Sequence, residues 1–201
     1  MKSNTALISK TKKINLTDQL SEIIKIIVQN TTLFRHVDTG KVLVCVSSNK
    51  KNGRGGTYGK LLPLKFKDGE SILKYKGKYY TIPRIINNGI PQLYIIYFYM
   101  PKFFDLNPYE KLRVIFHELY HINEEFNGDI RRMGELKKAH GFSSKRFNSL
   151  FQNELNIFHE YITTVQTAEF LKMDTASLEK EYHRIYCRRL KLPKPVTLEE
   201  N

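Results

Sequence analysis

The segment LYIIYFYM, at residues 93–100, is the longest apolar run in the chain and strongly limits what the chain can form. Its length is less than half of the roughly 20 residues that a membrane-crossing helix requires. A short run rich in aromatic and β-branched residues is typical of a buried strand. We therefore expect a buried strand at this position and no membrane-spanning segment.

The patterns on the two sides of this run differ. Residues 16–30 place Leu20, Ile23, Ile24 and Ile27 at helical spacing, which predicts a first helix. Extended segments follow in KVLVCVSS, TYGKLLPLKF and SILKYKGKYYTI, with KDGE as a tight turn between the last two. Helical spacing then continues to about residue 190. Strands followed by helices predict an α+β fold with one small, mostly antiparallel sheet.

Composition predicts a single packed domain. The 201 residues are 41% hydrophobic and 12% aromatic, which is typical of a globular chain. We expect a basic tail at residues 1–14, one domain at 15–192 and a tail at 193–201. The N-terminal residues lack the apolar stretch of a signal peptide, and the two cysteines, Cys45 and Cys187, form no disulfide framework. These features predict a cytoplasmic protein with free thiols.

The chain is strongly basic, with 33 Lys and Arg against 20 Asp and Glu and a net charge of +13. Ten basic residues and two acids lie between Lys41 and Lys78. Such an excess raises affinity for DNA and other polyanions, and Lys50, Lys51 and Arg54 in the loop NKKNGRGG are the predicted contacts. The alternative is that these charges are solvated and bind nothing.

The stretch FHELYHI, at residues 116–122, lies on a helix with a clear predicted start. Asn107 is an N-cap candidate, Pro108 suits the first helical position, and a glutamate follows at the third. Asn127-Gly128 is the predicted end. Apolar side chains fall on one face and the histidines fall opposite, as they would on any surface helix, so periodicity alone does not assign a function.

The spacing of two histidines nevertheless suits a metal. Four residues apart, His117 and His121 project from one side of a helix and can bind one zinc ion. Glu118 then reaches a water on that ion instead of the ion itself, and can accept its proton during attack on a carbonyl. A catalytic zinc site needs a third protein ligand, which this pair lacks.

His140 is the predicted third ligand. Asp129 can cap a second helix in which Ile130 and Met133 mark the inward side, and His140 would fall on that side before Gly141 ends the helix. A histidine on an apolar face is usually a core residue, but the incomplete pair favours a ligand. The alternatives for the third zinc ligand are Glu124, Glu125, Glu154 and His159.

Taken in order, HELYHI, GDIRRM, KAHG and SSKRF resemble the SprT-like zinc metallopeptidases, and most closely the branch described as putative phage metallopeptidases. The similarity extends upstream through GTYGKLLPLKF and covers about residues 20–150. It implies three zinc ligands, His117, His121 and His140, with Glu118 as catalytic base. The metzincin pattern fails, because Glu124 and Asn127 stand where glycine and histidine are required.

The resemblance also implies a zincin-like core in which the edge of a sheet lies over the active-site helix. The strand LYIIYFYM or a neighbour would be that edge, and an extended peptide could pair with it. The SprT-like protein Spartan degrades proteins that are crosslinked to DNA, and it uses separate parts to bind the DNA. This chain lacks the zinc-ribbon cysteines of those parts.

Several other residues have open roles. An oxyanion-stabilising group is expected near the zinc, and spacing does not rank its candidates: Tyr120, Arg132, His159 and Tyr161. Tyr120 projects away from the ligand side, which favours a packing role. Asp129 could orient a ligand histidine, although an N-cap role is favoured.

The sequence therefore predicts a single-domain, zinc-dependent endopeptidase that acts on a protein or peptide. Proteins associated with nucleic acid are one candidate class of substrate. The alternative is a DNA-binding or regulatory protein whose zinc site is structural or inactive. Oligomeric state and natural substrate do not follow from the sequence.

Overall fold

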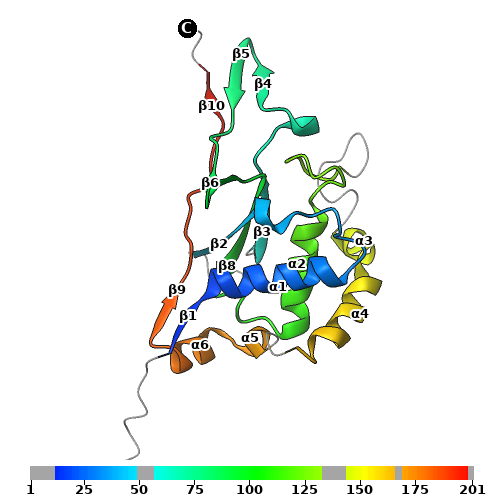
Figure 1. The fold of residues 1–201 in the computed structure, drawn as a ribbon, viewed down its shortest axis with the longest axis vertical. Coiled ribbons are helices and arrows are strands. Elements are labelled where there is room, and N and C mark those ends of the chain that lie inside the picture. Colours follow the sequence, from blue (N-terminus) through cyan, green and yellow to red (C-terminus); the bar gives the residue numbers. More distant parts are fainter. Residues whose placement is uncertain (1–11, 49–56, 133–143, 166–168, 199–201) are drawn as a thin grey trace, which may run out of the picture.

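The computed structural model describes residues 12–48, 57–132, 144–165 and 169–198. They form a mixed α+β protein with several helices and small sheets (Figure 1). The helices are α1 (Leu16–Asn30), α2 (Pro108–Tyr120), α3 (Ser144–Ser149), α4 (Gln152–Ile162), α5 (Glu169–Lys172) and α6 (Thr175–Glu181). The strands are β1 (Lys13–Asn15), β2 (Val42–Ser48), β3 (Gly59–Pro63), β4 (Ile72–Tyr75), β5 (Lys78–Thr81), β6 (Ile86–Asn87), β7 (Ile90–Pro91), β8 (Tyr94–Met100), β9 (Arg184–Tyr186) and β10 (Val196–Thr197).

The central sheet has the order β2-β8-β3, so the apolar strand β8 lies in the middle. β8 runs parallel to β2 and antiparallel to β3. Inward side chains on one face pack with α1 and α2 in the main core, whereas Leu43, Cys45, Ile95 and Tyr97 on the other face form a second buried cluster. Burial on both faces explains why β8 is apolar at nearly every position instead of alternating.

The expectation of one mostly antiparallel sheet is wrong. The described strands form four small sheets, and the central one is mixed because β2 and β8 are parallel. The KDGE turn does form, with Asp68 and Gly69 at positive φ angles of 58° and 80°. It does not close a hairpin between the flanking strands, since β3 and β4 belong to different sheets.

Both long helices begin as the sequence predicts. The Asn15 side chain accepts a hydrogen bond from Thr17 N, and the Asn107 side chain accepts one from Glu110 N. Each bond satisfies one of the unpaired amides in a first helical turn. Among the described residues, none of the helices combines the length and apolar character needed to cross a bilayer.

The end of α2 differs from the prediction. The helix ends at Tyr120, not at Asn127-Gly128, because the chain turns back and Ile122 forms an antiparallel bridge with Ile130. Arg131 N donates to His121 O at 2.7 Å and reinforces this return. A helix capped by Asp129 is also wrong for the described part, since residues 130–132 are not helical.

Two short strands near the ends of the described chain pair with distant segments. β1 pairs with β9, and β10 pairs with β5. The region predicted to be helical to about residue 190 contains α4, α5 and α6 and then the strand β9, and Leu155, Phe158 and Ile162 of α4 are buried. After β9 the chain returns to the sheets, where Arg188 O accepts a hydrogen bond from Val46 N and Leu198 N donates one to Tyr79 O.

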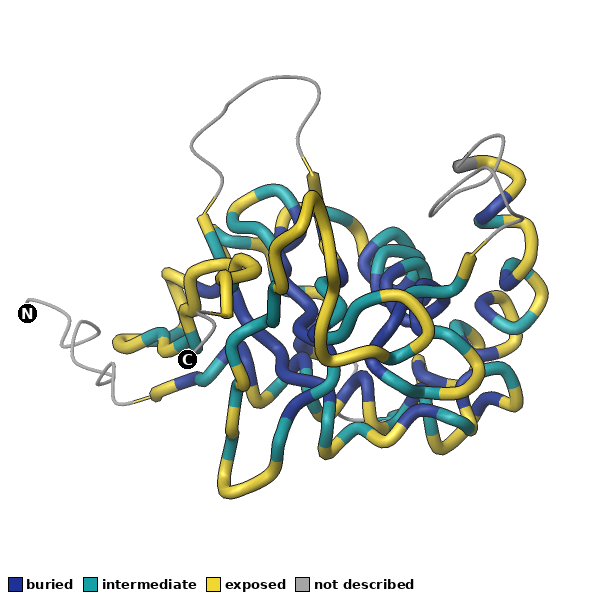
Figure 2. The backbone as a smooth tube through the Cα atoms, turned by 90° about the horizontal axis from the view of Figure 1, so that it is seen from above, coloured by how far each residue is buried: buried dark blue, intermediate teal, exposed yellow. Residues whose placement is uncertain are grey.

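Strands β4, β5 and β10 form a three-stranded antiparallel sheet that we call the arm. It extends from one end of the molecule, away from the helices (Figure 1). All four residues of β4 and both of β10 are exposed. Figure 2 shows the contrast between buried chain in the body and exposed chain at the periphery. The arm therefore contributes little to the core.

Candidate metal centre

The last turn of α2 brings the motif residues together. His117 and Glu118 lie within the helix, and His121 is its C-cap residue with helical backbone angles (φ −70°, ψ −17°). The helical register is thus kept from residue 117 to 121, and both imidazoles project from one side. Their Nε2 atoms lie 3.1 Å apart, and their ring planes are nearly perpendicular at 84°.

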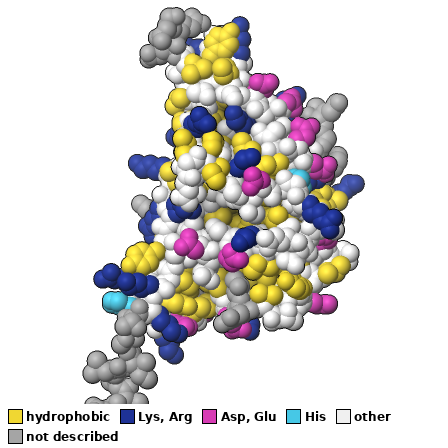
Figure 3. Space-filling model, viewed as in Figure 1, with side chains coloured by type: hydrophobic (Ala, Val, Ile, Leu, Met, Phe, Trp, Pro, Cys, Tyr) yellow, Lys and Arg dark blue, Asp and Glu magenta, His cyan; other side chains and the backbone are white. Residues whose placement is uncertain are grey.

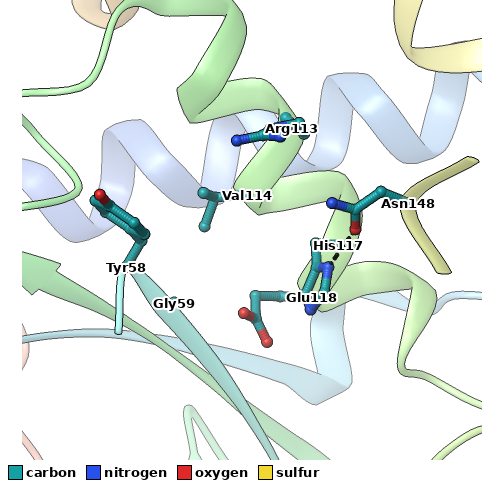
Figure 4. A pocket seen from close by; sticks show the side chains of 7 residues that line it. All are labelled: Tyr58, Gly59, Arg113, Val114, His117, Glu118 and Asn148. Carbon is teal, nitrogen blue, oxygen red and sulfur yellow. Dashed lines mark hydrogen bonds between the residues drawn. The ribbon is translucent and has the colours of Figure 1, made fainter. Parts of the chain in front are cut away.

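Helix α3 holds His117 from the side. Asn148 Oδ1 lies 2.7 Å from His117 Nδ1, and an amide oxygen only accepts hydrogen bonds (Figure 4). The proton of His117 is therefore on Nδ1, and its Nε2 lone pair points toward His121. This is the hydrogen bond by which metal-binding histidines are commonly oriented. Phe147 completes the support, since its ring stacks on His121 at 4.6 Å and contacts His117 at 4.9 Å.

The pair fits a zinc ion by donor chemistry and by separation. Two nitrogens bound about 2.0–2.1 Å from one tetrahedral zinc lie roughly 3.4 Å apart, close to the 3.1 Å found here. Among the described residues, no group of three or more His, Cys, Asp or Glu could hold a metal. His140, the predicted third ligand, lies outside the described residues, so the described part contains two of the three predicted ligands.

Glu118 is buried beside the pair, with 6% of its surface exposed. Burial raises its pKa to about 7, while the hydrogen bond from Leu61 N and the charge of Lys60 oppose this increase. Leu61 N donates to Glu118 Oε2 at 2.7 Å, so the edge strand β3 holds the carboxylate. A carboxyl group with a pKa near neutrality can both accept and release a proton in that range.

Strand β3 approaches α2 closely at Gly59. A Cβ atom at this position would lie 2.9 Å from Glu118 Cγ and 2.9 Å from Val114 Cγ1. Glycine is therefore required for the strand and the carboxylate to sit this close. Since β8 is central, β3 is the sheet edge that lies over the helix among the described residues, and it is the neighbouring strand that the resemblance allowed.

Two cavities meet at Glu118 and His117. One, of about 220 Å³, is lined by residues that include Tyr58, Arg113 and Asn148 (Figure 4). The other, of about 560 Å³, extends past His121 and is largely apolar, with Leu62, Pro63 and Ile130 in its wall. An extended chain laid along β3 would pass over both.

One comparison with known proteins identifies a family. A model of the family described as putative phage metallopeptidase matches residues 13–149, about two thirds of the chain. The chain belongs to this family. No curated protein and no solved structure matches it. For a metallopeptidase, the family implies a bound metal ion and a protein substrate, and the histidine pair and its buried glutamate lie within the matched residues.

Three other residues predicted at the site, Tyr120, Asp129 and Arg132, do not line the two cavities beside the histidine pair. Tyr120 packs against Phe147 and Phe151, with Arg131 over its ring at 4.3 Å. Asp129 accepts two hydrogen bonds from Arg132, at 2.9 and 3.0 Å, and one from Asp68 N. Asp129 and Arg132 thus brace the loop after α2.

The two candidates on α4 are also separated from the cavities. The His159 ring packs edge-on against Tyr109 at 5.1 Å, and Tyr161 is 43% exposed with its ring against Phe158. Neither lines the cavities at Glu118. Lys50, Lys51 and Arg54, the predicted nucleic-acid contacts, lie outside the described residues.

Sequence reasoning missed Asn148, Phe147, Tyr58 and the Leu61 amide. Phe147 is the last residue of SSKRF, which carried part of the resemblance, and Asn148 follows it. A search for partners of His117 in this segment could therefore have found both residues. The Leu61 amide has no side-chain signal, because any non-proline residue supplies the same donor.

Proposed function

We propose that this chain is a zinc-dependent endopeptidase in which His117, His121 and His140 hold one ion and Glu118 is the general base. The observation that carries the proposal is the pair of facing Nε2 atoms beside a buried carboxylate beneath a sheet edge. If the two histidines and Glu118 served only as an ion pair or as core residues, their imidazole nitrogens and carboxylate would have no reason to converge where two cavities meet. The family's implied metal and protein substrate support the same conclusion.

The residues have distinct roles in the proposed reaction. A bound zinc ion would polarise the scissile carbonyl and lower the pKa of the attacking water. Glu118 accepts a proton from that water and later delivers it to the leaving nitrogen. Asn148 keeps the His117 proton on Nδ1, so that Nε2 is available as a ligand. Tyr58 and Arg113 line the adjoining cavity and are the candidates to stabilise an oxyanion.

The edge of β3 is the proposed binding surface for the substrate backbone. The bonds from Tyr99 N to Tyr58 O and from Leu64 N to Leu93 O show that even-numbered residues of this segment face β8. Gly59, Leu61 and Pro63 therefore direct their backbone carbonyls away from the sheet, toward an added strand. Gly59 also directs its N–H there, whereas Pro63 has no N–H and the Leu61 N–H is bonded to Glu118. Glu118 takes the Leu61 amide, so the catalytic carboxylate lies at the line that the peptide would follow.

Replacing Glu118 tests the mechanism. Glu118→Gln keeps the shape and the hydrogen bond from Leu61 N but cannot act as a base. We expect about 100-fold or greater loss of cleavage of an unfolded protein, with zinc content unchanged. Glu160→Gln, on the exposed side of α4, is the matched control and should retain full activity. Equal turnover by Glu118→Gln and wild type would refute this role.

A second candidate function is a DNA-binding or regulatory protein with a structural or inactive metal site. The net charge of +13 favours polyanion binding and keeps this candidate open. Metal analysis together with spectroscopy of a cobalt-substituted protein distinguishes the two. Three protein ligands and an exchangeable water support the endopeptidase, whereas a fourth protein ligand and no cleavage of any unfolded protein support the alternative.

A further inference from the structure

We propose that one face of the arm binds single-stranded nucleic acid, with bases stacking on Tyr75 and Tyr80 and phosphates contacting Lys76 and Lys78. This goes beyond the proposed peptidase activity and uses no residue of the metal centre. It concerns described residues, unlike the basic loop at residues 49–56. The inference depends on three observations: the exposure of the arm, its charge and the way its side chains alternate.

The arm exposes large side chains that a folded protein usually buries. Ile72, Leu73 and Tyr75 on β4 are 51%, 41% and 55% exposed, and Tyr79 on β5 is 37% exposed. Val196 on β10 is 47% exposed. Leu73 and Tyr75 lie on one face of the hairpin, and Ile72, Tyr79 and Val196 lie on the other. Exposed apolar and aromatic side chains of this kind commonly mark an interaction site. Figure 3 shows hydrophobic and basic side chains together at this end of the molecule.

The charge of the arm selects a polyanionic partner. Residues 72–84 contain four Lys and Arg and no Asp or Glu. The chain that returns to the arm, residues 187–198, contains four more and again no acid, although Glu199 and Glu200 follow outside the described residues. Within the described parts of the chain, Lys74, Lys76 and Lys78 have no carboxylate at ion-pair distance. These charges therefore remain available to phosphates.

The register of the hairpin divides its rings between two faces. Tyr75 pairs with Lys78 and Leu73 pairs with Tyr80, so these four side chains share one face. The diagonal neighbours Tyr75 and Tyr80 are about 7–8 Å apart at this geometry, which successive unstacked nucleotides can span. Lys76 Nζ lies over the Tyr75 ring, 5.4 Å from its centroid, so a positive charge adjoins this ring.

The opposite face has a single tyrosine. Tyr79 shares it with Lys74, whose Nζ lies 5.4 Å from the ring centroid, and with Ile72. One ring among aliphatic side chains is a poorer stacking platform than two adjacent rings with two cations. This difference lets two exposed tyrosines of the same hairpin serve as test and control.

Single-stranded nucleic acid fits this face better than other partners. Stacking requires unpaired base faces, which a duplex hides. A second copy of the chain would bring two lysine-rich edges of a +13 molecule together, which is unfavourable. An acidic protein would use the lysines but would not require flat aromatic rings in particular.

Fluorescence anisotropy with a labelled 20-nucleotide oligothymidylate tests the proposal on the full chain. Tyr75→Leu, which keeps apolar bulk but removes the ring, should weaken binding roughly 5- to 100-fold. Tyr75→Phe should bind like wild type, and Tyr79→Leu on the opposite face should do the same. Circular dichroism of each variant confirms that the fold is retained. Wild-type affinity in Tyr75→Leu would overturn the proposal, and equal losses in Tyr75→Leu and Tyr79→Leu would overturn the chosen face.

The charge component has its own matched pair of variants. Replacing Lys76 and Lys78 with Ala should reduce the slope of log affinity against log salt by about 1.4. Replacing Lys172 and Lys180, on α5 and α6, removes the same charge and should leave the slope unchanged. Equal slopes in both double variants would contradict the assignment.

Three further outcomes separate other partners from the proposed one. Poly-glutamate binding as tight as oligothymidylate, and insensitive to Tyr75→Leu, would indicate an acidic protein and overturn the proposal. Tighter binding of a 20-base-pair duplex would do so as well, as would a dimer in sedimentation that Tyr75→Leu abolishes. Glu118→Gln should bind oligothymidylate normally, so failure of the peptidase proposal would not affect this result.

Discussion

At the scale of single residues, the surroundings of Glu118 set both its position and its pKa. Its carboxylate is confined between α2 and β3, where burial raises the pKa to about 7 and the Leu61 amide fixes one oxygen. Gly59 leaves room for Glu118 Cγ and Oε1, each of which would lie 2.9 Å from a Cβ atom at that position. Asn148 performs the equivalent task for His117. Leu61, Gly59 and Asn148 therefore position the motif side chains without being proposed ligands or bases themselves.

Gly59→Ala should displace the Glu118 carboxylate, because the new methyl group would lie 2.9 Å from Glu118 Cγ and Oε1. Misplacement of a catalytic group by about 1 Å can cost roughly 100-fold in rate, so we expect a loss of that order in cleavage. Zinc content should stay unchanged. Gly40→Ala is the control, since its Cβ would meet only the Asp38 side chain. Full activity in Gly59→Ala would show that the strand can move aside.

Asn148→Ala should weaken zinc binding by about 10- to 100-fold, because His117 loses the acceptor for its Nδ1 proton. Asn148→Asp, which retains an acceptor, should bind at least as tightly as wild type. Competition with a chromogenic chelator measures both affinities. Asn153→Ala, at an exposed position of α4, controls for general effects. Unaltered affinity in Asn148→Ala would exclude a positioning role.

At the scale of elements, α2 connects the metal centre to the C-terminal helices. Lys111, two turns before His117, is 2% exposed, and its Nζ donates to Leu171 O at 2.9 Å and Met173 O at 2.6 Å. This bond pair holds the end of α5 against α2. Burial lowers the pKa of Lys111 to about 8, while Asp174 and Asp105 oppose the shift.

The lowered pKa predicts a pH dependence of stability. Between about pH 8 and 10.5 the unfolded chain binds more protons at Lys111 than the folded chain, so this residue's contribution to the free energy of unfolding rises with pH. The rise is on the order of 2–3 kcal/mol. Burial also raises the pKa of Cys45 to about 11, which acts in the opposite direction.

Urea denaturation of wild type and Lys111→Met across this pH range isolates the lysine. The stability difference, wild type minus variant, should increase with pH, because Cys45 contributes equally to both proteins. Lys180→Met, on the exposed side of α6, should show no such trend. A difference that is constant from pH 8 to 10 would contradict the assignment.

At the scale of the whole molecule, the proposed metal site joins distant parts of the chain. α2 supplies two ligands, α3 supplies their supports, and β3 supplies the donor to Glu118. The arm shares no residue with this group. Peptide cleavage and nucleic-acid binding, as proposed, would thus occupy separate surfaces of one body.

Zinc should stabilise the whole fold, since it binds the folded chain in preference to the unfolded one. At a free zinc concentration 100 times the dissociation constant, the free energy of unfolding should rise by about 2.7 kcal/mol, and a chelator should reverse the change. His140→Ala should lose most of this effect if it is the third ligand, whereas His183→Ala should keep it. Full stabilisation in His140→Ala would assign the third ligand elsewhere. Thermal melts with and without zinc provide the measurement.

The sequence determined the local structure of this protein. Caps at Asn15 and Asn107, the apolar strand β8 and the four-residue histidine spacing are set by short-range chemistry, and all are present in the structure. The tertiary structure decided the rest. α2 ends at Tyr120 because Ile122 pairs with Ile130, β3 becomes the edge over Glu118 because β8 lies between β2 and β3, and β10 forms because a distant strand accepts it. Such contacts depend on backbone groups that every residue carries, so side-chain patterns cannot specify them.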